Sequence, residues 1–65
     1  MGESDIKNIL IVDDEEAILA SLSYALKAEG VDVVTCTGIG QAVEALLAAR
    51  FDLVIAEISY RASMN

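Results

Sequence analysis

The chain has 65 residues, 55% of them hydrophobic, and its eleven acidic and four basic side chains give a formal net charge of −7. It can therefore form at most one small domain, and the acidic balance excludes a nucleic-acid-binding surface, which needs clustered lysine and arginine. The chain has one cysteine and no histidine, so neither a disulfide nor a zinc site can support the small core. It has no signal-peptide pattern and no long apolar run, which predicts a cytoplasmic protein without membrane contact.

The first half of the chain predicts a strand followed by a helix. Residues 1–7 are polar and are expected to form a loose amino-terminal tail. Residues 8–12 form an apolar, β-branched run, which indicates a strand that is covered on both faces. Over residues 15–29, acids occupy the first turn, apolar residues recur at three- and four-residue steps, and Gly30 follows as a stop signal, so we expect a helix. Its apolar positions are Ile18, Leu22, Ala25 and Leu26.

The second half repeats this alternation. Residues 31–37 predict a second strand, residues 41–50 a second helix in which alanine, valine and leucine recur in helical register, and residues 51–59 a third strand. Residues 60–65 form a polar tail. Strands that alternate with helices form right-handed βαβ units, so we expect an α/β domain over residues 8–59 with a parallel sheet in the order two, one, three.

Three acids are expected to meet at one edge of this sheet. Asp13 and Asp14 end the first strand, and Glu57 lies near the end of the third strand, its neighbour in the predicted order. Polar groups at the carboxyl ends of adjacent parallel strands converge on one crevice, and carboxylates held close together favour a hard cation such as Mg²⁺. The alternative is that Asp13 and Asp14 cap and charge the first helix while Glu57 points to water.

Several stretches resemble the first half of a receiver domain of bacterial response regulators, the phosphoacceptor module of two-component signalling. They read ILIVDDEEAILASL, ALKAEG, VDVVTC and QAVEALLAARFDLVIAEIS, and the resemblance covers residues 8–59. The acid pair after an apolar first strand, combined with a third strand of the form Phe-Asp-Leu-Val-Ile-x-acid, is specific as a combination. The resemblance implies the parallel βαβαβ half of a flavodoxin-like (CheY-like) fold.

The resemblance also implies roles for individual residues. Asp13 and Asp14 match the Mg²⁺-binding acid pair, with Asp14 as the direct ligand, and the backbone carbonyl of Ser59 matches a further ligand. Glu57 matches the aspartate that accepts a phosphoryl group from the phosphohistidine of a sensor histidine kinase. A sensor histidine kinase or another receiver is therefore an expected partner.

Two departures from the family affect this expectation. Glutamate replaces aspartate at position 57, which displaces the reacting oxygen by about 1 Å or more, a shift that can cost ~100-fold in rate. The chain also lacks the family's later strands with their hydroxyl and lysine. We therefore expect no phosphotransfer and no enzymatic activity from the chain alone, and weak Mg²⁺ binding. Glu57 either imitates part of the phosphorylated state or marks a receiver that no longer switches.

The third strand predicts self-association. In the complete family fold this strand is paired on both sides, whereas here Leu53, Val54, Ile55 and Ala56 would leave an apolar edge with no proline or bulge to protect it. Two copies could pair their third strands about a twofold axis into one six-stranded sheet, with Tyr60 as a further candidate interface residue. The leading hypothesis is thus a truncated receiver-like module of phosphorelay signalling that dimerises.

Two other hypotheses remain open. The chain could be the amino-terminal piece of a full response regulator or hybrid-kinase receiver that controls an output, with Glu57 native or introduced as a phosphomimic; the length of the reading frame beyond Asn65 would distinguish this case. An Mg²⁺-dependent phosphatase on a related acidic scaffold is disfavoured, because no basic group is placed to bind a phosphate.

Overall fold

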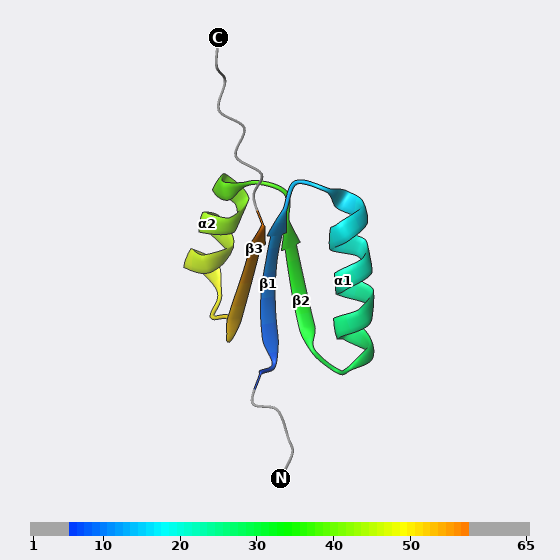
Figure 1. Ribbon diagram of the computed structural model, residues 1–65. Helices are drawn as coiled ribbons and strands as arrows, with labels where there is room; N and C mark the ends of the chain where they lie inside the picture. The colour runs from blue at the N-terminus through cyan, green and yellow to red at the C-terminus, as the bar shows by residue number, and fades with distance from the viewer. Residues whose placement is uncertain (1–5, 58–65) are drawn as a thin grey trace.

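The computed structural model describes residues 6–57, in which a three-stranded sheet is packed between two helices (Figure 1). Ser59, Tyr60 and the residues at the two ends of the chain lie outside this range. Neither helix in the described part is long and apolar enough to cross a membrane. In chain order the elements are β1 (Asn8–Asp13), α1 (Glu16–Ala28), β2 (Asp32–Cys36), α2 (Ile39–Ala48) and β3 (Leu53–Glu57).

All strands of the sheet are parallel, and their order is β2-β1-β3. The register aligns Ile9 with Val33 on one side and with Leu53 on the other. The chain leaves β1 toward β2 through α1 and then crosses back to the far side of β1 through α2. Because both crossovers are right-handed, the two helices lie on opposite faces of the sheet (Figure 1). The predicted α/β class and strand order are confirmed.

β1 forms the centre of the core. Leu10 and Val12 point to the α2 side and pack with Cys36 and Ala42. The alternate residues Ile9 and Ile11 point to the α1 side, where they pack with Leu19. Leu10 and Ile11 are the largest fully buried side chains of the described residues. The uninterrupted apolar run is therefore explained by a layer of helix on each face.

Helix α1 has nearly the predicted bounds but buries a different residue. Leu19 is its buried side chain, whereas Ile18 and Leu22 are each more than a third exposed. The apolar face of the helix is broad, and the residues at its centre that pack against the sheet are Leu19 and Leu26. At the end of the helix Gly30 adopts a φ of 86°, a left-handed conformation that favours glycine, and its N–H donates to the carbonyl of Lys27.

Helix α2 begins at Ile39, two residues before its predicted start at Gln41. The extended Gly38 is the N-cap, and its carbonyl accepts the Ala42 N–H. The side-chain carbonyl of Gln41 accepts the Thr37 N–H at 2.9 Å, so the glutamine reaches back over the first turn. This side-chain contact supports the early start of the helix.

Asp52 ties the start of β3 to the start of β1. Its Oδ2 accepts the Lys7 N–H at 2.8 Å and the Asn8 N–H at 3.1 Å, and its own N–H donates to the Asn8 carbonyl at 2.9 Å. The Lys7 carbonyl in turn accepts the Asp32 N–H at 2.9 Å. Lys7, at the end of the segment expected to form a loose tail, is therefore hydrogen bonded to Asp32, the first residue of β2, and to Asp52, which directly precedes β3. We call this arrangement the Asp52 clamp.

The Asp52 clamp makes stability depend on pH. The backbone N–H groups of Lys7 and Asn8 lower the pKa of the Asp52 carboxyl, because they stabilise its charged form. The charged form thus stabilises the fold above the unfolded pKa of about 3.9, and this contribution is lost as pH falls through the lower folded pKa.

We predict that the free energy of unfolding decreases more steeply below about pH 4 in the parent than in Asp52→Asn, because the amide cannot titrate. Urea unfolding at a series of pH values measures this slope. Asp32→Asn removes the same charge at the start of β2 and serves as the matched control. Equal slopes for the parent and Asp52→Asn would contradict a role of the clamp in acid stability.

Candidate functional site

The three predicted acids lie at the carboxyl end of the sheet. Asp13 ends β1 and is the register partner of Glu57 at the end of β3, and residues aligned in this way share a face of the sheet. Asp14 follows directly, in the bend that leads to α1. A hollow of about 130 Å³ is lined by all three acids together with Glu15 and Ile18. We call it the acidic hollow.

Asp13 is buried, with only 4% of its surface exposed. Its Oδ1 accepts the N–H of Glu15 at 2.9 Å, which closes a short turn between β1 and α1. This hydrogen bond lowers the cost of burying the Asp13 carboxylate. It also gives the Glu15 N–H, which has no partner within the helix, an acceptor at the helix start. Asp13 therefore performs part of the helix-starting role considered as an alternative, and it lines the acidic hollow as well.

Asp14 and Glu57 differ from Asp13 because both are exposed. Their surroundings are strongly acidic, since the first turn of α1 adds further carboxylates at this end of the molecule. The three basic residues of the described chain lie at the opposite end, before β1, in the last turn of α1 and before β3. The acids are Asp13, Asp14, Glu15, Glu16 and Glu57, and the bases are Lys7, Lys27 and Arg50.

The donor atoms of the acidic hollow suit a hard cation, because they are carboxylate oxygens. Their arrangement does not form a complete metal site: within residues 6–57, no group of three or more acidic, histidine or cysteine side chains is spaced to hold an ion. The predicted carbonyl ligand of Ser59 lies outside the described residues. The carboxylate oxygens are thus suitable cation ligands, but the described residues do not hold them in a preformed metal site.

Sequence reasoning did not include Glu15 and Ile18 in the site. Both belong to the start of α1, which follows β1 after a short turn and therefore must face the end of the sheet. The short interval between the predicted strand and helix was the feature of the sequence that could have indicated these two residues. Ile18 contributes an apolar wall, and no hydroxyl-bearing or cationic side chain of the described residues lines the acidic hollow.

The predicted interface residues lie on an edge of the sheet. In the described residues β3 pairs with β1 alone, and the helices lie closer to β1 and β2 than to β3, although Ile55 packs against the core cluster that contains Leu19 of α1. Leu53 and Ile55 share the face that carries α1, while Val54 and Ala56 share the opposite face. Leu53 and Val54 are exposed, and Ile55 is half-buried. Tyr60 lies outside the described residues.

Comparison with known proteins found a response regulator. The chain is 36% identical over 52 residues to the alkaline phosphatase synthesis transcriptional regulatory protein PhoP of Bacillus subtilis (strain 168). The match covers 80% of this chain and 22% of PhoP. No family model and no solved structure matches the chain. Together with the β2-β1-β3 topology, the similarity confirms the resemblance: residues 8–57 have the fold of the amino-terminal half of a response-regulator receiver domain.

Proposed function

We propose that the chain is a partial receiver module of two-component signalling that works in the cytoplasm through protein contacts and not by phosphotransfer of its own. The observation that carries this proposal is the pairing of Asp13 with Glu57 at the carboxyl end of a receiver-like sheet. A sensor histidine kinase or another receiver is the proposed class of signalling partner. The similarity to a response regulator supports the signalling role.

Glu57 occupies the position of the phosphoacceptor without the surroundings that phosphotransfer requires. Its longer side chain displaces the carboxylate by about 1 Å or more relative to aspartate. In the described residues the acidic hollow presents no cationic group, so negative charge that develops on a transferring phosphoryl group would not be neutralised. A permanent carboxylate at this exposed position supplies one negative charge where a phosphoryl group would supply roughly two.

We predict that acetyl phosphate and Mg²⁺ add no phosphoryl group to the protein, and that Glu57→Asp restores little or no modification, because among the described residues no cationic side chain lines the acidic hollow in either form. Intact-mass spectrometry measures the product directly. A complete response regulator treated in parallel shows that the phosphodonor is active. A stable phosphoryl adduct on Glu57 would refute the proposed incompetence.

Weak Mg²⁺ binding by Asp13 and Asp14 belongs to the same proposal. The two carboxylates offer oxygen ligands beside Glu57, and the surrounding acids favour a cation by charge. Asp13 keeps one oxygen on the Glu15 N–H, so this oxygen is already engaged in the turn. We therefore expect a site that binds at millimolar rather than micromolar concentration.

Two substitutions separate the roles of Asp13. Asp13→Asn preserves an oxygen acceptor for the Glu15 N–H and removes one of the neighbouring charges, so it should stabilise the metal-free protein. Asp13→Ala removes the acceptor and should destabilise the fold by about 1 kcal/mol. Millimolar Mg²⁺ should raise the thermal unfolding midpoint of the parent by more than that of Asp13→Asn. Equal gains would exclude Asp13 from cation binding.

Self-association through β3 is the third part of the proposal. Among the described residues, the backbone donors and acceptors on the outer edge of this strand have no partner strand. Leu53 and Val54 of this strand are exposed apolar side chains, and α2 carries others, among them Leu47, which is 84% exposed. A second copy that pairs its own β3 with this edge would satisfy the backbone groups and bury part of this surface. Such a dimer completes the sheet from identical halves.

The chain offers a matched pair of edge residues for testing the dimer. Val54 on β3 and Val34 on β2 share the α2 face of the sheet and are 43% and 42% exposed. Lysine at position 54 should dissociate the dimer, because a charge on an edge strand opposes pairing, whereas Val34→Lys should leave it intact. Analytical ultracentrifugation measures the mass, and dilution should lower the unfolding midpoint of the parent. A folded parent monomer at micromolar concentration would refute the association.

A second candidate function follows from the comparison. The chain spans about a fifth of the length of PhoP. The same segment could therefore act as the first half of a larger response regulator that controls an output, in which case a later strand of the same protein would pair with β3. The length of the reading frame beyond Asn65 distinguishes this function from that of a self-associating module.

A further inference from the structure

The outer edge of β2 is the second free edge of the sheet, and it is built differently from that of β3. Among the described strands β2 pairs with β1 alone. Helix α1 packs over this strand and over β1. On the opposite face of the same edge, Val34 is 42% exposed. A strand added here would therefore meet a helix on one face and an apolar residue on the other.

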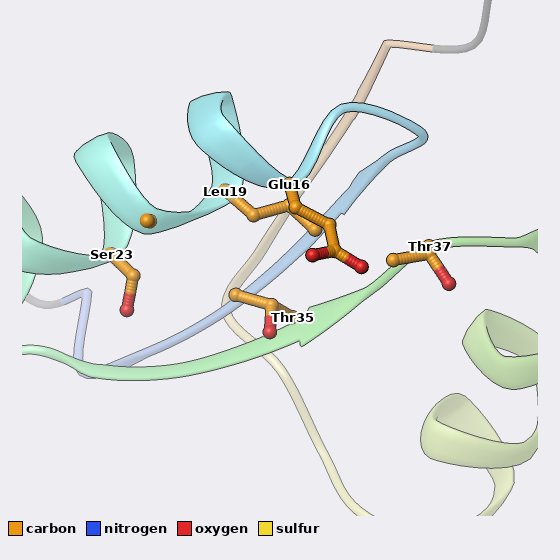
Figure 2. A pocket seen from close by; sticks show the side chains of 6 residues that line it. Glu16, Leu19, Ser23, Thr35 and Thr37 are labelled. Atoms are coloured by element: carbon orange, nitrogen blue, oxygen red, sulfur yellow. The ribbon is translucent and has the colours of Figure 1, made fainter.

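A groove of about 320 Å³ lies between α1 and β2. Its floor includes the buried Leu19, and its rim carries hydroxyl groups and one carboxylate. Figure 2 shows the Glu16 carboxylate directed from the first turn of α1 toward β2, where in this view it lies between Thr35 and Thr37. The lining residues are Glu16, Leu19, Ala20, Ser23, Thr35 and Thr37. We call this the α1-β2 groove.

We propose that the α1-β2 groove and the adjoining edge of β2 bind an extended segment of a partner protein in which basic and apolar residues alternate. The free edge of β2 would supply backbone hydrogen bonds to the added strand. Side chains of a strand alternate between faces, so every second residue of the segment would enter the groove and the others would cover Val34.

Charge complementarity determines the kind of residue that enters the groove. A lysine could lay its aliphatic stem along Leu19 and Ala20 and bring its ammonium to the Glu16 carboxylate, with hydroxyl oxygens such as that of Thr35 as further acceptors. A second copy of this chain fits the site poorly, because none of its described strands carries a lysine or arginine that could meet the Glu16 carboxylate. The proposed segment therefore belongs to a different, basic partner, and its site does not overlap the β3 edge.

The test uses the full chain and a short fluorescent peptide of alternating valine and lysine. Fluorescence anisotropy measures the affinity, and Glu16→Gln should weaken it about fivefold, the effect of one partly exposed ion pair. Glu44→Gln removes the same charge from the exposed surface of α2 and should change affinity by less than about twofold. Equal weakening by the two variants would overturn the proposal, since it would indicate attraction to the overall charge alone.

A second probe tests the strand pairing itself. A peptide of the same sequence with methylated backbone nitrogens at alternate positions keeps its charge but cannot donate the ladder hydrogen bonds, so its binding should be lost. Amide chemical-shift changes produced by the unmethylated peptide should centre on Asp32–Cys36 and on the first half of α1. Equal binding of the methylated peptide, or shift changes centred on Asp14 and Glu57, would overturn the proposal.

Discussion

The burial of β1 on both faces is the constraint on which the rest of the molecule depends. Leu10 and Ile11 are fully buried on opposite sides of the strand, and each buried side chain of this size contributes about 1.5–3 kcal/mol relative to exposure. One helix cannot cover both faces. The chain therefore places α1 on one side and α2 on the other, and the return crossover through α2 moves β3 to the far side of β1.

The same constraint gives the two central acids of the acidic hollow different environments. Asp13 is buried because it continues the buried strand, and the hydrogen bond from the Glu15 N–H offsets the cost of burying its carboxylate. Glu57 is its register partner, but it ends a strand at the edge of the described sheet, and its side chain is exposed to solvent. One acid thus holds a turn in place while the other is presented at the surface, where a signalling partner could contact it.

Periodicity and topology rules were sufficient to predict the order of the elements, the parallel sheet and the meeting of the three acids. They could not choose Leu19 over Ile18 as the buried residue of α1, because both lie within one broad apolar stripe. At the early start of α2 the side-chain carbonyl of Gln41 accepts hydrogen bonds from the N–H and the hydroxyl of Thr37, a local contact that periodicity does not reveal. The Asp52 clamp and the α1-β2 groove join residues distant in sequence, and such contacts leave no periodic signal. Cation geometry depends on side-chain orientation, which spacing does not specify.

The Asp52 clamp also has a consequence for the order of folding. It joins residues 45 positions apart, whereas the unit from β1 through α1 to β2 closes over a shorter span of chain. Contacts of long sequence separation form late, because more of the chain must be ordered before they stabilise it. We expect β1 and β2 to pair first, with the N–H groups of Lys7 and Asn8 at the beginning of β1 still without the Asp52 carboxylate. The arrival of β3 then fixes that end, so the first and last strands become ordered in one cooperative step.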